Sequence, residues 1–184
     1  MATFKINGKN FATQDGTGAA TIHADVVFPS GFPIQVVNKN FPNNYSHSGT
    51  SNAFVAVSGF TQTFTLTSST NKVLVLLSTT IGNSNNTYHT AVRVVRDGTA
   101  LMDAVGSRGL ALGGHQTTYS NTDNSTRNGT GTYYDSPGTT SEVTYAVQGY
   151  SHSGTFYMNR AATDSNEAGY MIGTSNLTLI EIQE

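Results

Sequence analysis

The stretch Thr61-Gln62-Thr63-Phe64-Thr65-Leu66 decides the fold class, because its residues alternate strictly between two kinds. In an extended chain the three threonines fall on one face, and Gln62, Phe64 and Leu66 fall on the other. A period of two residues is typical of a β-strand that has one face on a core and the other in water. The segment therefore predicts a half-buried β-strand, with Phe64 and Leu66 facing inward.

Residues Glu142 to Tyr150 repeat this alternation, with Val143, Tyr145 and Val147 expected to face the core. The segment Val73 to Leu77 is instead apolar throughout, which predicts a strand buried on both faces. Periodicity alone leaves a short helix open as an alternative for this segment. Its β-branched residues favour the strand.

Further strands are predicted where β-branched and aromatic residues lie between turn signals. They are Thr21 to Phe28, Ile34 to Val37, Ala53 to Phe60, Thr87 to Val95, Thr155 to Asn159 and Leu177 to Gln183. The pairs Asn7-Gly8 and Asp97-Gly98 lie between apolar segments and predict tight hairpin turns, since both central residues of a type I′ turn need positive φ. Strands at this spacing predict a β-sandwich.

The composition agrees with an all-β protein. Thr, Gly, Ser and Asn make up 82 of the 184 residues, and charged residues are 11%, against about 25% in ordinary globular domains. The shortage falls mainly on Lys and Glu, which are strong helix formers, so a helical protein is nearly excluded. The lack of cysteine excludes disulfides, thiolate nucleophiles and sulfur-bound metals.

Charge and patterning also disfavour several partner classes. The formal net charge of −2 is spread thinly and offers no basic surface to nucleic acid. No run approaches the ~18 continuous apolar residues of a membrane span, so no membrane insertion is expected. The five histidines never stand four residues apart, and Asp123 supplies too little charge for calcium in its Asn-rich loop. We expect no metal and no cofactor.

No catalytic residues are predicted. A glycosidase needs two carboxyl groups flanking the scissile bond, and a serine hydrolase needs a nucleophile on a turn such as Gly-x-Ser-x-Gly. Neither pattern is present, and several of the 11 acidic residues fall at expected loop ends or near the C-terminus. The expectation is a non-enzymatic protein.

Residues Gly106 to Ser141 form the longest segment without a recognisable strand pattern, and such loops are usually functional or contain short strands. Its tyrosines stand among Asn, Asp and Thr, a combination suited to stacking on sugars and hydrogen-bonding their hydroxyls. The candidates for glycan or receptor binding are Tyr119, Tyr133, Tyr134, His115, Asp123 and Asn124. The alternative is that these tyrosines pack at strand ends with their hydroxyls in water.

The chain is predicted to divide into an N-terminal attachment arm (residues 1–31) and a sandwich head (residues 32–184). The arm contains one small hairpin, and an isolated hairpin is marginally stable in water, so Phe4, Ile6 and Phe11 need a partner surface. We expect that surface to belong to another protein of an assembly. The alternative is that the arm adds its strands to the head's own sheet.

The hexapeptide Tyr45-Ser46-His47-Ser48-Gly49-Thr50 recurs letter for letter at Tyr150 to Thr155. A single recurrence is not a solenoid, which needs at least three units. One interpretation is chance in a chain rich in Ser, Thr and Gly. The other is that two loops meet the same kind of partner.

A series of short segments follows in fixed order after the arm. They are Phe28-Pro29-Ser30-Gly31, Ile34-Gln35-Val36-Val37, Ser69 to Val75, Asp135-Ser136-Pro137, Tyr145-Ala146-Val147-Gln148, Ser153-Gly154-Thr155, Asn159-Arg160 and Leu177 to Ile182. In this order they resemble a family of jelly-roll domains in virion proteins of marine tailed bacteriophages, usually described as structural or tail-fibre-like.

The resemblance implies a jelly-roll head similar in layout to the trimeric heads of tumour necrosis factor and complement C1q, and it implies a homotrimer. The candidates for the head core and subunit contacts are Tyr145, Val147, Phe156 and Tyr157. It further implies a virion protein, assembled in the host cytoplasm, which contacts other phage virion proteins through its arm and carries no catalytic residues.

The function expected on these grounds is a tail-fibre or receptor-binding knob that recognises host surface glycan. A capsid decoration protein that stabilises the phage head is the alternative, and a polysaccharide depolymerase is a weaker one.

Overall fold

The computed structural model is all-β, as the sequence predicts, and it describes residues 2–14, 16–22, 26, 28–48, 53–84, 89–106, 108–116, 126–170 and 172–184. The strands are β1 (Ala2–Ile6), β2 (Lys9–Gln14), β3 (Thr21–Ile22), β4 (Pro33–Phe41), β5 (Tyr45–Ser48), β6 (Val55–Phe64), β7 (Lys72–Asn83), β8 (His89–Arg96), β9 (Thr99–Ala100), β10 (Gly113–Gln116), β11 (Arg127–Asp135), β12 (Val143–Ser151), β13 (Thr155–Met158) and β14 (Ser175–Ile182).

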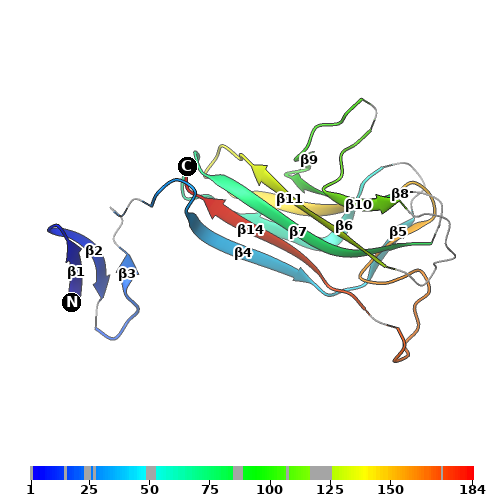
Figure 1. Ribbon diagram of the computed structural model, residues 1–184, viewed down its shortest axis with the longest axis horizontal. Helices are drawn as coiled ribbons and strands as arrows, with labels where there is room; N and C mark the ends of the chain where they lie inside the picture. Colours follow the sequence, from blue (N-terminus) through cyan, green and yellow to red (C-terminus); the bar gives the residue numbers. More distant parts are fainter. Residues whose placement is uncertain are drawn as a thin grey trace.

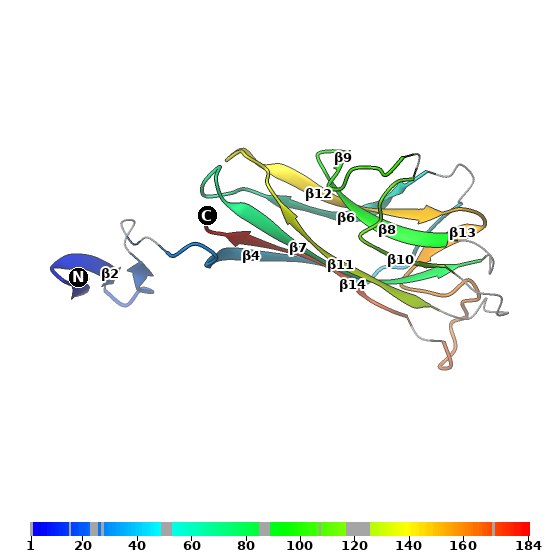
Figure 2. The ribbon, with the colours of Figure 1, turned by 45° about the horizontal axis from the view of Figure 1, so that its top comes forward.

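Two antiparallel sheets pack face to face to form the head (Figures 1 and 2). The first sheet has the order β6-β12-β8-β10, with the short β9 also paired to β8. The second has the order β4-β14-β7-β11, and β13 and β5 extend it beyond the end of β14. The predicted β-sandwich is therefore observed.

The core lies between the sheets and is built from the inward positions of alternating strands. Val143, Tyr145 and Val147 of β12 are buried, and so is Phe64 of β6, which confirms the two alternations. Phe156 of β13 is also fully buried. Each large apolar side chain removed from water in this way stabilises the fold by about 1.5–3 kcal/mol.

Tyr157 behaves differently from the other candidate core residues. Its side chain is half-buried, and the guanidinium carbon of Arg160 lies 4.7 Å from the centre of its ring. Of the four candidates for core or subunit contact, Tyr145, Val147 and Phe156 thus belong to the core of the single chain.

The segments Ala53 to Phe60 and Thr61 to Leu66, predicted separately, both contribute to one strand, β6 (Val55–Phe64), which contains a bulge. Its pairing with β12 shifts register between Ala146 and Gln148, and Gly59 lies inside the shifted part with a φ of +79°. A bulge adds a residue to one strand and bends it, and glycine adopts a positive φ without strain.

The prediction that Val73 to Leu77 is buried on both faces is wrong. Val73, Val75 and Leu77 point into the core, whereas Leu74 and Leu76 lie on the outer face of β7 and are only half-buried. The sandwich has two layers, so one face of each sheet lies outside. The predicted strand Thr21 to Phe28 is also too long, since only Thr21–Ile22 is strand among its described residues.

The long segment Gly106 to Ser141 contains two strands, β10 and β11. Their glycines allow the edges of the two sheets to approach closely. A Cβ added to Gly113 would lie 2.7 Å from the backbone of Gly129, and one added to Gly131 would overlap the carbonyl oxygen of Leu112. These glycines are needed where β10 and β11 close one side of the sandwich.

The N-terminal strands β1, β2 and β3 form a separate antiparallel sheet, and within the described ranges they pair only with one another. Asn7 and Gly8 have φ values of 50° and 77°, which confirms the predicted hairpin turn. Phe4 contacts Phe11 edge to face, yet 60% of Phe4 and 52% of Ile6 remain exposed. This leaves an apolar surface on the small sheet.

The chain enters the head through a turn at Pro29 to Phe32, where Gly31 has a φ of +85°. The Gly31 amide donates to the carbonyl of Gln183 at 2.8 Å, and the Gln183 amide donates to Phe32 at 2.9 Å. These bonds tie the turn to the last residues of the chain. The arm thus joins the end of the head that holds the C-terminus (Figure 1).

We call the opposite end of the sandwich the distal end. The pairings Ile182–Pro33 and Ile182–Lys72 lie at the arm end, and the pairings Ser151–Thr90 and Phe156–Asn83 lie at the distal end. Strands β6 and β8 begin at the distal end, and β12 ends there (Figure 2).

Candidate functional site

A cleft of about 770 Å³ opens at the distal end, on the outer face of the first sheet, and we call it the distal cleft. It lies over the start of β8 and the end of β12. Its polar and aromatic lining consists of Phe54, His89, Arg93, Arg108, Tyr150 and His152.

The alternation of side chains along β8 and β12 determines which residues form the floor of the distal cleft. Because Val92 and Val94 of β8 point into the core, Ala91 and Arg93 point outward. On β12 the inward Val147 leaves the neighbouring residues outward, and cross-strand pairing sets Gln148 beside Arg93 and Tyr150 beside Ala91. The floor therefore combines the cation of Arg93 with the phenol of Tyr150, and Gln148 lies beside the cation.

One wall of the distal cleft comes from the segment between β9 and β10. Val105 and Arg108 exchange backbone hydrogen bonds of 3.0 and 3.2 Å, which fold this segment back on itself. The same segment contributes Gly109 and Ala111, and Ala91 lies on the floor. These small side chains leave the space unfilled.

Arg93 and Phe54 form the fixed centre of the distal cleft. The guanidinium carbon of Arg93 lies 4.1 Å from the centre of the Phe54 ring, and Arg93 Nε donates to Gln148 Oε1 at 2.8 Å. Phe54 in turn packs on Tyr150 with ring centres 5.2 Å apart. Burial lowers the pKa of Arg93, but arginine stays charged at neutral pH.

None of the described residues that line the distal cleft is a carboxylate. In the described part of the chain, the ion pairs join Arg96 to Asp135 and Arg160 to Asp164, so neither Arg93 nor Arg108 has a carboxylate partner there. The cleft is a cationic site in a protein of formal net charge −2.

The buried carboxylates lie elsewhere and connect parts of the fold. Asp135 of β11 pairs with Arg96 of β8 and accepts a hydrogen bond of 2.7 Å from the hydroxyl of Tyr145 on β12. Burial, followed by the bond to Asp135, raises the pKa of Tyr145. This network joins the two sheets at the arm end.

The described residues hold no group of three or more His, Asp or Glu side chains arranged to bind a metal ion. Among the same residues there is also no helix of the length and apolarity needed to cross a membrane.

The structure separates Tyr133 and Tyr134, which are neighbours on β11 and point to opposite faces of its sheet. Tyr133 is half-buried against the core. Tyr134 is 49% exposed on the outer face, where its hydroxyl donates to Glu184 Oε1 at 3.0 Å. The two predicted glycan residues do not share one surface, and neither lines the distal cleft.

His115 lies on β10 opposite Thr90, near the distal end. The predicted residues Tyr119, Asp123 and Asn124 lie outside the described residues. The flanking strands both reach the distal end, since Gln116 pairs with His89 and Arg127 pairs with Ile81.

The two copies of the repeated hexapeptide meet at the distal end. The first forms β5 and the second spans the end of β12 and the start of β13, where Thr155 pairs with Ser48. The second copy supplies Tyr150 and His152 to the distal cleft. The ring nitrogens of His47, in the first copy, are buried without a hydrogen-bond partner in the described part.

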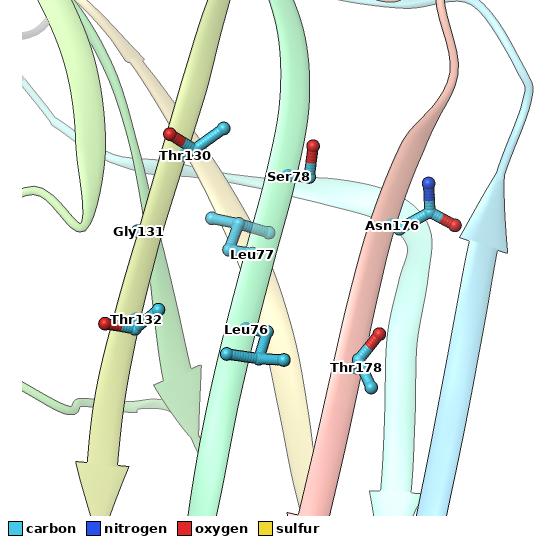
Figure 3. Close-up of a pocket in the computed structure, with 8 residues that line it drawn as sticks. All are labelled: Leu76, Leu77, Ser78, Thr130, Gly131, Thr132, Asn176 and Thr178. Atoms are coloured by element: carbon cyan, nitrogen blue, oxygen red, sulfur yellow. The ribbon is translucent and has the colours of Figure 1, made fainter.

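A second, shallower hollow of about 320 Å³ lies on the outer face of the second sheet, and Figure 3 shows it in close-up. Leu76 of β7 stands between Thr132 of β11 and Thr178 of β14, and Ser78 stands between Thr130 and Asn176. The described residues that line it are all uncharged.

The chain matches no model of a known protein family, and no curated protein matches its sequence.

Proposed function

We propose that the chain is a non-enzymatic surface protein of a bacteriophage particle, and that it acts as a receptor-binding knob for host surface glycan. The observation that carries this proposal is the distal cleft, with its aromatic rings, cations and hydrogen-bonding groups. It opens at the end of the head opposite the point where the arm enters. A knob attached through its arm would present this end outward.

The strand order supports a jelly-roll head of the kind that such virion proteins have. Strands β4, β14, β7 and β11 lie in one sheet, and β6, β12, β8 and β10 lie in the other. The chain therefore crosses between the sheets at most of its connections. Jelly rolls are double-sheet sandwiches of eight strands connected in this interleaved manner.

We further propose that the head forms a homotrimer through the outer face of the second sheet. Successive cross-strand rows there are Thr130-Ser78-Asn176-Asn40, Thr132-Leu76-Thr178-Asn38 and Tyr134-Leu74-Ile180-Val36. None of these residues is charged, and Val36 is 60% exposed. These three rows carry no charged side chain, so they can pack on a second copy at little desolvation cost, and closed symmetry limits assembly.

The arm provides a direct test of attachment. Deletion of residues 2–27 removes β1 to β3 and keeps the bonds that Gly31 and Phe32 make with Gln183. We expect the shortened protein to stay soluble, folded and trimeric by light scattering, and to be missing from purified virions. A full-length variant with Phe4→Ser and Ile6→Ser should also fail to enter virions, because it lacks the exposed apolar groups.

Two outcomes would count against the arm proposal. Aggregation, or a much lower melting temperature after the deletion, would mean that β1 to β3 belong to the head core. Normal incorporation of both variants into virions would mean that attachment uses another surface.

A full-length protein that is monomeric at micromolar concentration would overturn the proposed trimer.

The glycan-binding function is tested with purified protein on a glycan array and in a reducing-sugar assay. We expect binding to a restricted set of glycans and no release of reducing ends. Sustained polysaccharide cleavage, abolished by a single Asp or Glu substitution, would show a depolymerase instead. A decoration protein would give a different set of results. It would bind no glycan, it would be present in many copies per virion, and capsids that lack it would be less stable.

A further inference from the structure

We infer that the distal cleft binds a saccharide unit that carries a carboxylate, with Arg93 and Arg108 on the acid group and the Phe54–Tyr150 pair against the sugar ring. This inference rests on the proposed glycan-binding function and names the ligand class of that site.

The side chain of Arg93 is preorganised to bind an anion. Its Nε donates a hydrogen bond to Gln148 and its guanidinium group lies against the Phe54 ring. The side chain therefore loses little conformational freedom when a ligand binds. No carboxylate from the described residues neutralises it. Among the described residues the terminal nitrogens of Arg93 have no hydrogen-bond partner, and a partly desolvated guanidinium favours a charged oxygen acceptor over a neutral hydroxyl.

Arg108 adds a second positive charge on the wall formed by the β9–β10 connection, and its side chain is exposed. Two like charges in one cleft repel each other, and neither arginine has a carboxylate partner among the described residues, so a bound anion would offset this repulsion. A neutral sugar would leave both charges uncompensated. The charge pattern therefore favours an acidic unit.

The cleft also has the size and surface that a sugar needs. Its volume of about 770 Å³ falls within the ~300–1,000 Å³ of small-molecule sites. The Phe54 and Tyr150 rings offer apolar area for the C–H face of a pyranose. The Tyr150 hydroxyl and His152 Nδ1, 3.3 Å apart, place polar groups beside that area.

The test measures binding of the full-length protein to three sets of oligosaccharides: carboxylated, sulfated and neutral. Arg108→Gln removes one exposed charge, and Ala111→Trp fills the cleft from an exposed loop position. Arg127→Gln, on an exposed residue of the other sheet, is the matched control. Melting temperatures establish that all variants fold.

We expect the carboxylated set to bind, with at least a tenfold loss for Arg108→Gln and Ala111→Trp and no change for Arg127→Gln. Raised salt should weaken binding in the wild type more than in Arg108→Gln. Preference for sulfated sugars would overturn the assignment of a carboxylate. Binding of neutral glycans that is unaffected by Arg108→Gln and Ala111→Trp would overturn the inference while leaving the proposed function standing. Binding to none of the three sets would overturn both.

Discussion

Replacement of Gly131 by alanine is expected to lower the free energy of unfolding by about 3 kcal/mol, the upper part of the usual range for overpacking. An added Cβ would overlap the carbonyl oxygen of Leu112 and lie 2.7 Å from Leu112 Cγ. The backbones of Gly131 and Leu112 are both fixed by strand or loop hydrogen bonds, so neither can move away easily. Gly131 is held in the ladder between β11 and β7, and the Leu112 amide donates to the carbonyl of Val92 at 2.9 Å.

Chemical denaturation of the purified protein measures this effect. Gly169→Ala is the matched control, because a Cβ at Gly169 meets nothing within 4 Å and its backbone does not require glycine. The control should unfold at the same denaturant concentration as the wild type. A Gly131→Ala variant within 0.5 kcal/mol of the wild type would show that β10 and β11 are not closely packed in solution.

The glycines near β10 and β11 explain why the sequence did not predict these two strands. Gly113-Gly114 and Asn128-Gly129 are typical of turns, and they support a loop interpretation. On β11 the inward positions include Gly129 and Gly131, so the apolar alternation that reveals a strand is missing. The glycines that permit close packing of the two sheets take the place of apolar side chains. The alternation of apolar and polar residues, by which a strand is recognised in a sequence, is therefore absent.

Where inward positions carry large apolar residues, the sequence predicted the structure well. β6 and β12 were found from their alternation, and both predicted turns have the positive φ values of their type, with Asp97 at 49° and Gly98 at 83°. The outer face of β7 could not be predicted, because a run such as Val73 to Leu77 looks the same whether both faces are covered or one is open.

The distal cleft could not be predicted as a site because its residues come from separate parts of the chain. Phe54 precedes β6, Arg93 lies on β8, Arg108 lies in the β9–β10 connection, and Tyr150 lies near the end of β12. Only the strand register brings them together. The sequence did contain one indication, since alternation sets Arg93 and Tyr150 on outward positions of their strands. The pairing of those strands was the missing information.

Glu181 of β14 has no exposed surface and is the most deeply buried carboxylate among the described residues. Its Oε1 accepts bonds from the Thr67 amide at 2.8 Å, the Thr67 hydroxyl at 2.7 Å and the Asn71 side chain at 2.7 Å. Its Oε2 accepts a bond of 2.6 Å from Gln35. The carboxylate thereby links β14 to the β6–β7 connection and to β4 through hydrogen bonds at the arm end.

Replacement of Glu181 by glutamine should lower the free energy of unfolding by about 3 kcal/mol at pH 7, because hydrogen bonds to a charged group are lost and a buried donor is left facing another. The new amide group would point at the amide of Gln35, which also donates to the carbonyl of Thr65 at 2.6 Å. If Gln35 turned to accept this bond, it would lose the one to Thr65. No rotation of either side chain satisfies all the donors.

The loss of unfolding free energy caused by Glu181→Gln should become smaller as the pH falls. Burial raises the pKa of Glu181, but the bonds from Asn71, Thr67 and Gln35 outweigh it, so the pKa in the folded protein lies below the ordinary value. A group with a lowered pKa stabilises the fold above its unfolded pKa of about 4.3, and this contribution is lost as pH falls through the folded value. The stability difference between wild type and Glu181→Gln should therefore be constant above about pH 5 and shrink in more acidic solution. Glu142→Gln, at an exposed position before β12, should show no such difference. If the gap between wild type and Glu181→Gln does not change between pH 7 and pH 3, the carboxylate is not held in its charged form by these bonds.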